Sequence, residues 1–219
     1  MKTNKTELVF ILDRSGSMSG LESDTIGGYN SLLGKQRMEE GTAIVTTVLF
    51  DDKFELLHDR LDINGISDIS EKDYFVRGST ALLDAIGKTI NKIGNVQKHT
   101  KPEMRADKVL VIITTDGMEN SSLEYSYDQI KKMIERQKTQ FGWEFIFLGA
   151  NIDALATAER FGIDASRAVN YHSDKMGTHL NYSTLNKTVS KFRSEARIDD
   201  DWKADIEKDF TDRSDKKKN

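Results

Sequence analysis

The chain of 219 residues contains no cysteine and only one proline. Without cysteine it has no disulfide, no thiolate metal ligand and no cysteine nucleophile, and it suits a reducing compartment. Basic charge is not in excess either, because 32 lysines and arginines face 36 acidic residues, which gives a net charge of −4. Proteins that bind nucleic acid usually carry a basic face. The composition therefore argues against a nucleic-acid partner.

Long apolar runs are also missing. The first apolar stretch covers only residues 8–12 and ends at Asp13, which is too short for a signal peptide. No stretch approaches the roughly 20 apolar residues of a membrane-spanning helix. With 37% hydrophobic and 31% charged residues, the chain has the composition of a globular protein. We therefore expect a cytoplasmic protein that does not associate with a membrane.

Short, continuous apolar runs rich in β-branched and aromatic residues predict buried strands. Runs of this length favour a sheet that is covered on both faces. The segment at 53–63 follows one such run after Asp51-Asp52, a plausible tight turn, so these two segments are expected to form a hairpin. The predicted strands are residues 8–13, 43–50, 53–63, 109–114 and 144–148, with a weaker one at 168–171.

Amphipathic patterns between these runs predict helices. The clearest lies at residues 80–93, where apolar side chains recur every three or four positions. Strands that alternate with helices imply an α/β fold. We expect a doubly wound, mostly parallel six-stranded sheet with one antiparallel edge strand and helices on both faces. The other predicted helices are residues 21–38, 127–141, 154–161 and a stripe at 182–192.

The C-terminal end differs in composition from the rest. Residues 195–219 are dense in charge, yet Ile198, Trp202, Ile206 and Phe210 recur every four positions. This spacing predicts a short amphipathic helix followed by a mobile tail. We therefore divide the chain into a domain at 1–194 and a charged segment at 195–219. The Trp202 side chain packs either on this domain or on another chain.

Hydroxyl and carboxylate side chains recur at three separated places. Asp13, Ser15 and Ser17 follow the first strand, Thr80 opens the clearest helix, and Asp116 follows the strand at 109–114. Ligands of open parallel sheets bind at the carboxyl ends of the strands, where both aspartates are expected to lie, with Asp13 facing solvent. Such oxygens suit Mg²⁺ or Mn²⁺. An ion held mostly by neutral hydroxyls keeps enough charge to attract a further carboxylate.

The order and spacing of these residues resemble the metal-ion-dependent adhesion site of von Willebrand factor A domains and integrin I domains. Asp13, Ser15 and Ser17 match its D-x-S-x-S motif, and Thr80 and Asp116 match its separate threonine and aspartate. The resemblance covers residues 7–172. It implies direct metal contacts from the three hydroxyls, contacts mainly through water or hydrogen bonds from the two aspartates, and a partner's Asp or Glu that completes the coordination.

The resemblance implies a protein-interaction module rather than an enzyme. Stand-alone domains of this kind resemble adaptor-like components of intracellular bacterial systems, some of them working with AAA+ ATPases. The rival hypothesis is a Mg²⁺-dependent phosphoryl-transfer or phosphate-hydrolysing enzyme, for which Arg14 or Arg77 would have to face the metal. A third is a former metal domain that now serves as a scaffold. The chain lacks a P-loop, and Ser15 stands where aspartyl phosphatases carry a second aspartate.

Overall fold

A six-stranded sheet forms the centre of the molecule. The computed structural model describes residues 4–216. Its strands lie in the order β3-β2-β1-β4-β5-β6. Only β3 runs antiparallel to its neighbour, and the other pairings are parallel. The predicted fold class is therefore confirmed. The strands are β1 (Lys5–Asp13), β2 (Thr42–Phe50), β3 (Phe54–Asp62), β4 (Lys108–Thr115), β5 (Glu144–Gly149) and β6 (Ala168–Asn170).

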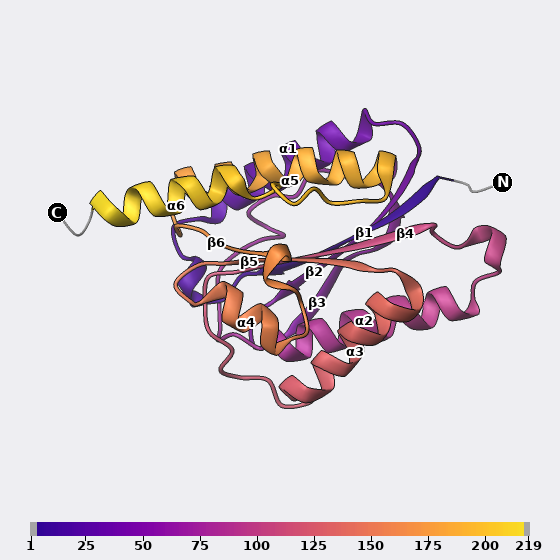
Figure 1. Ribbon diagram of the computed structural model, residues 1–219, viewed down its shortest axis with the longest axis horizontal. Coiled ribbons are helices and arrows are strands. Elements are labelled where there is room, and N and C mark those ends of the chain that lie inside the picture. Colours follow the sequence, from indigo (N-terminus) through magenta and orange to yellow (C-terminus); the bar gives the residue numbers. More distant parts are fainter. Residues whose placement is uncertain (1–3, 217–219) are drawn as a thin grey trace.

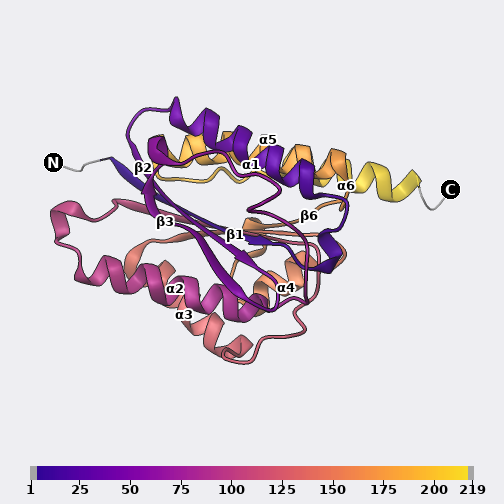
Figure 2. The same ribbon diagram turned by 180° about the vertical axis from the view of Figure 1, so that it is seen from behind.

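Helices cover both faces of this sheet. In Figures 1 and 2, α1, α5 and α6 lie on one face, and α2, α3 and α4 lie on the other. Each strand contributes alternate side chains to two cores, so Phe10 of β1 packs toward α1 and α5 while Val9 packs toward α2 and α3. The helices are α1 (Glu22–Arg37), α2 (Leu82–His99), α3 (Tyr127–Phe141), α4 (Ala154–Arg160), α5 (Lys175–Glu195) and α6 (Ala204–Lys216).

The C-terminal segment docks on the domain itself. Ile198, Trp202 and Ile206 are at most 8% exposed and belong to the core on the α1 side. Helix α6 begins only at Ala204, later than the apolar spacing predicts. Residues 200–203 before it form turns, and within them the Trp202 indole donates to the Ser166 carbonyl (2.8 Å). Of the predicted mobile tail, residues 211–216 belong to α6, and 217–219 lie outside the described residues.

Two further observations bear on the sequence-based expectations. Within residues 4–216, no helix is both long and apolar enough to cross a bilayer. The sequence also predicts that all four histidines lie at the surface, and this is wrong for His58. Its ring is 9% exposed and lies 3.0 Å from the Thr47 hydroxyl, and burial lowers its pKa.

Candidate metal centre

The predicted site residues meet where the direction of strand progression reverses. Strand β1 pairs with β2 on one side and with β4 on the other. Asp13 ends β1, and Asp116 follows the last residue of β4, so both lie at the carboxyl edge of adjacent parallel strands. This is where open α/β sheets bind ligands. The structure therefore brings the two aspartates together as the sequence predicts.

Three hydroxyl groups converge beside these aspartates. The Ser15 and Ser17 hydroxyls are 3.1 Å apart, and the Thr80 hydroxyl donates to that of Ser15 (3.0 Å). A Cβ placed on Gly117 would lie 3.0 Å from the Ser17 Oγ, 3.1 Å from the Thr80 Oγ1 and 3.8 Å from the Ser15 Oγ. The three hydroxyls thus face one small space that stays open because residue 117 has no side chain.

Asp13 lies beneath this cluster and is fully buried. Its carboxylate accepts hydrogen bonds from the Ser15 backbone N–H (2.7 Å) and the Thr115 hydroxyl (2.5 Å). Burial raises its pKa, although these hydrogen bonds act in the opposite direction. The expectation that Asp13 faces solvent is wrong, because the chain turns back over the strand end and covers it. Replacing Asp13 therefore disturbs the fold as well as the site.

Asp116 is also buried, at 1% exposure. One carboxylate oxygen accepts a hydrogen bond from the Ser173 hydroxyl (2.8 Å), and the other is buried without a hydrogen-bond partner among the described residues. No cationic side chain within residues 4–216 forms an ion pair with Asp13 or Asp116. Buried carboxylates are unfavourable without a compensating positive charge. A divalent cation between them and the hydroxyls would supply it.

Arg14 and Arg77 point toward other partners. The Arg14 side chain is fully buried and donates to Asp51 (3.0 Å) and Glu55 (2.6 Å). Arg77 donates to the same Asp51 carboxylate (2.6 Å), and the Phe75 ring lies over both guanidinium groups. Burial alone would raise the Asp51 pKa, but the hydrogen bond from Arg77 and the charge of Arg14 lower it. Both arginines are thus engaged in this ion-pair network.

Thr80 is held by the loop that follows Asp116. The Thr80 N–H donates to the Asn120 side chain (2.9 Å), and the Asn120 N–H donates back to the Thr80 carbonyl (3.0 Å). Thr80 does not open α2 as predicted, because the helix begins at Leu82. Asp84, in the first turn of α2, accepts three backbone N–H bonds of 2.9 Å from residues 123–125. The loop therefore fixes the Thr80 backbone from one side.

Among residues 4–216, no three His, Asp or Glu side chains gather closely enough to hold a metal. A cation at this edge of the sheet would therefore depend on the hydroxyls. Hydroxyl and carboxylate oxygens together suit Mg²⁺ or Mn²⁺ better than the softer metals. The residues present fit such an ion.

Comparison with known proteins bears on the fold. No protein-family model and no curated protein matches the sequence. Solved structures do match. A von Willebrand factor type A protein from Catenulispora acidiphila superposes with a TM-score of 0.58 at 12% identity, over 85% of this chain and 42% of that one. This chain has the von Willebrand factor A fold.

Two further neighbours of the same fold carry metal. Proximal thread matrix protein 1 from the mussel byssus, with a zinc-occupied metal-ion-dependent adhesion site, matches with a TM-score of 0.56 at 14% identity, over 84% of this chain and 46% of that one. Manganese-loaded TRAP protein of Plasmodium vivax matches with a TM-score of 0.55 at 16% identity, over 82% and 73%. This chain thus spans less than half of the bacterial and mussel proteins.

Three residues of this von Willebrand factor A fold escaped the sequence analysis. Thr115 donates to Asp13, Ser173 donates to Asp116, and Gly117 leaves the space that the hydroxyls face. Ser173 shortly follows β6, so the strand-end rule that selects Asp13 and Asp116 could have found it. Nothing in the local sequence indicates that its hydroxyl reaches a residue 57 positions away.

Proposed function

We propose that this chain is a metal-dependent protein-interaction module. Ser15, Ser17 and Thr80 would hold Mg²⁺ or Mn²⁺ through their hydroxyls, with Asp13 and Asp116 supporting the ion from below. The observation that carries this proposal is the meeting of three hydroxyls over two buried carboxylates that lack a cationic partner. The metal-loaded neighbours of the same fold support it.

The chemistry of this site favours an acidic partner. When bound, the ion supplies a concentrated positive charge, because its hydroxyl ligands are neutral. The two aspartates are held by hydrogen bonds from Thr115, Ser15 and Ser173. They therefore supply negative charge beneath the ion and leave its outer side free for a partner. An incoming Asp or Glu carboxylate is the protein group that best satisfies the remaining charge. We propose that the partner binds through such a residue.

Capture of the partner in Mg²⁺ and in EDTA tests this proposal. A partner isolated on the immobilised chain should be retained in Mg²⁺, released by EDTA and recovered when Mg²⁺ returns. One acidic residue of that partner should dominate, and its replacement by Gln or Asn should be nearly as damaging as replacement by Ala. A partner that remains bound in EDTA uses another face of the molecule, and the metal-dependent mode would then be abandoned.

The enzyme hypothesis receives less support from the site. Arg14 and Arg77, the basic groups closest in sequence to the motif, are engaged with Asp51 and Glu55. No histidine is among the groups that contact the hydroxyl cluster within residues 4–216. A phosphoryl-transfer site needs positive charge aimed at the phosphoryl oxygens beyond the metal ion itself.

We therefore expect no phosphate hydrolysis by the purified protein. With Mg²⁺ or Mn²⁺ present, nucleotides and aryl phosphates should be hydrolysed far below the roughly 10 s⁻¹ typical of enzymes. Release of inorganic phosphate is the measurement, and a Thr80→Val variant is the control for contaminating activity. Hydrolysis at an enzyme-like rate that disappears in this variant would establish the rival function.

The composition bears on the cellular setting that we propose. The absence of cysteine supports a reducing compartment such as the bacterial cytoplasm. A net charge of −4 supports neither a nucleic-acid partner nor an anionic membrane surface. Within that setting, we propose that the acidic partner belongs to an AAA+ ATPase system.

A further inference from the structure

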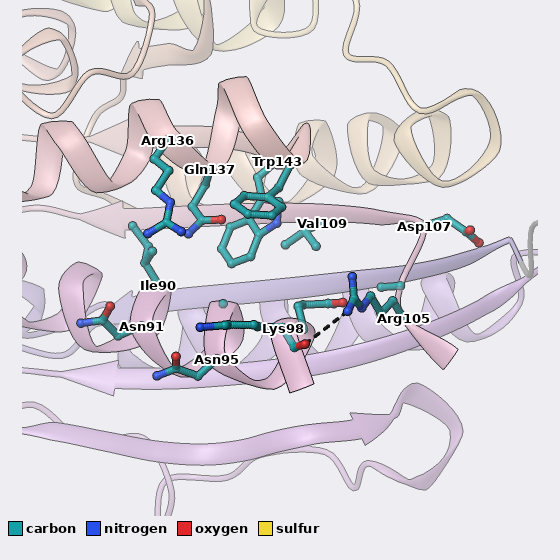
Figure 3. Close-up of a pocket in the computed structure, with 14 residues that line it drawn as sticks. Ile90, Asn91, Asn95, Lys98, Arg105, Asp107, Val109, Arg136, Gln137 and Trp143 are labelled. Atoms are coloured by element: carbon teal, nitrogen blue, oxygen red, sulfur yellow. Dashed lines mark hydrogen bonds between the residues drawn. The ribbon is translucent and has the colours of Figure 1, made fainter. Parts of the chain in front are cut away.

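A second cavity lies at the opposite end of the sheet from the metal centre. It has a volume of about 390 Å³ and is bounded by the last turns of α2 and α3, by residues 105–107, by Val109 near the start of β4 and by Trp143 just before β5. In Figure 3, Arg136 and Gln137 reach from α3 toward the α2 side, where Lys98 lies, with Trp143 between the two helices. This volume falls within the range of small-molecule sites.

Two mostly buried side chains, Gln137 and Trp143, line this cavity without a side-chain hydrogen bond to the described residues. Gln137 is 8% exposed, yet its side-chain amide forms no hydrogen bond within residues 4–216. On the other face of the sheet, the amide of buried Gln36 donates to Asn186 and Ser190 and accepts from Arg193. Fully buried amides are normally satisfied in this way. The Gln137 amide atoms are not among the fully buried, unpartnered atoms of the described residues, so the amide faces the cavity and is available to a ligand there.

The tryptophan of the cavity, Trp143, likewise has an indole without a hydrogen-bond partner among the described residues, in contrast to the other tryptophan of the chain. Trp143 is 4% exposed, and its indole N–H donates to no acceptor in the described part of the chain. The other tryptophan, Trp202, donates its indole N–H to the Ser166 carbonyl at 2.8 Å. The Trp143 nitrogen is not among the fully buried, unpartnered atoms of the described residues, so its N–H faces the cavity. Together with Ile90 and Val109, the Trp143 ring gives the cavity an apolar floor with one donor.

The rim of the cavity is positive, although the chain as a whole is negative. Lys98, Arg105 and Arg136 line it against one carboxylate, Asp107, which accepts the Lys5 backbone N–H (3.0 Å). Arg105 caps the end of α2 by donating to the Thr100 carbonyl (2.8 Å) and the Lys98 carbonyl (3.2 Å). Its charge offsets the negative end of the helix dipole.

The other two cations remain available. The Lys98 ammonium forms no ion pair or hydrogen bond with the residues that the structure describes. Among the described residues, the Arg136 guanidinium donates only to the Gln140 side chain (3.3 Å), and it lies over the Phe141 ring. These two cations lie on opposite walls of the cavity, so an anionic group between them would form charge-assisted hydrogen bonds with both.

We propose that this cavity binds a small aromatic anion. Its ring would pack against Trp143 and Phe141, a polar ring edge would pair with the Gln137 amide and the Trp143 N–H, and its acidic group would lie between Lys98 and Arg136. A nucleoside monophosphate and an aromatic carboxylate share this chemistry. The site shares no lining residue with the metal centre.

Tryptophan fluorescence can test this proposal in EDTA, where the metal centre plays no part. In a Trp202→Phe variant, Trp143 is the remaining tryptophan of the two in the chain. Benzoate or adenosine monophosphate should quench it saturably, and the neutral benzamide and adenosine should bind at least about tenfold more weakly. Calorimetry on the unmodified chain gives the same comparison without a substitution.

Matched variants locate the site. Lys98→Gln should weaken binding of both anions by about tenfold or more, and Gln137→Leu should do so for adenosine monophosphate, whose base has a polar edge. Lys101→Gln, on the neighbouring exposed loop, should change neither. Inorganic phosphate alone should bind much more weakly than the aromatic anions. No saturable signal up to on the order of 10 mM, equal binding of the neutral compounds or of phosphate, or unchanged affinity in both variants would overturn the proposal.

Discussion

A Thr80→Val variant should lose Mn²⁺ and Mg²⁺ binding while keeping its fold. Valine retains the branched shape of threonine but removes the hydroxyl that donates to Ser15. Loss of this hydrogen bond costs about 0.5–1.5 kcal/mol of stability. Even changes behind a metal's direct ligands typically weaken its binding by about 10–100-fold. For a direct ligand we therefore expect a loss of about 100-fold or more in a calorimetric titration.

Metal-dependent stabilisation gives a second measurement of the same effect. At a metal concentration of about 100 times Kd, binding stabilises the folded state by about 2.7 kcal/mol. The unmodified protein should therefore melt at a higher temperature in Mn²⁺ than in EDTA, and Thr80→Val should lose most of this difference. Ser79→Ala is the matched control, because Ser79 is an exposed hydroxyl residue beside Thr80.

This design avoids Asp13→Ala for a structural reason. Asp13 is fully buried and accepts hydrogen bonds from the Ser15 N–H and the Thr115 hydroxyl. Its removal leaves two donors unsatisfied, so lost binding could follow from a disturbed fold. If Thr80→Val binds Mn²⁺ as tightly as Ser79→Ala and the unmodified protein do, the hydroxyl cluster is not the metal centre.

Removal of residues 197–219 should strongly destabilise the domain. Ile198, Trp202 and Ile206 are buried in the core on the α1 side. Each large apolar side chain contributes about 1.5–3 kcal/mol on burial, and the whole domain has only about 5–15 kcal/mol. We expect the melting temperature to fall by about 10 °C or more. The cut after Ala196 keeps Arg193, whose buried guanidinium binds backbone carbonyls of residues 36–41.

Two single substitutions accompany the truncation, one to test the contribution of Trp202 and one as a control. Trp202→Ala should reproduce much of the loss, because the side chain fills the core and its indole donates to Ser166. Lys208→Ala, at an exposed position of α6, should change little. A truncated chain that melts with the full-length protein would mean that these contacts contribute no net stability, and that the apolar stripe serves another chain.

The C-terminal helix also touches the loop that holds Asp116. The Phe210 ring stacks on His172 with 4.8 Å between ring centroids, and Arg213 forms an ion pair with Asp174. Ser173, which donates to Asp116, lies between these two residues. Residues 195–219 were predicted as a separate charged segment, but their described part contributes to the surroundings of the metal centre.

The sequence by itself determined the strands, most helices and the five residues of the candidate site. The apolar runs of the sheet and the apolar stripe of α2 are local sequence patterns, so they can be recognised without knowing which elements pack together. The helix predicted at 127–141 from its apolar pattern has the same bounds as α3. Its ends are local as well, because Ser126 and Gln129 form a capping box and Gly142 ends the helix in a left-handed conformation.

Only the tertiary structure decided how the site is built. The burial of Asp13, the support of Asp116 by Ser173 and the engagement of Arg14 with Asp51 join residues that are 37 to 102 positions apart in the sequence. The same holds for Trp202, whose indole donates to Ser166, 36 positions earlier in the sequence. Sequence periodicity reports which face of one element is apolar, whereas these contacts depend on which elements become neighbours when the sheet assembles.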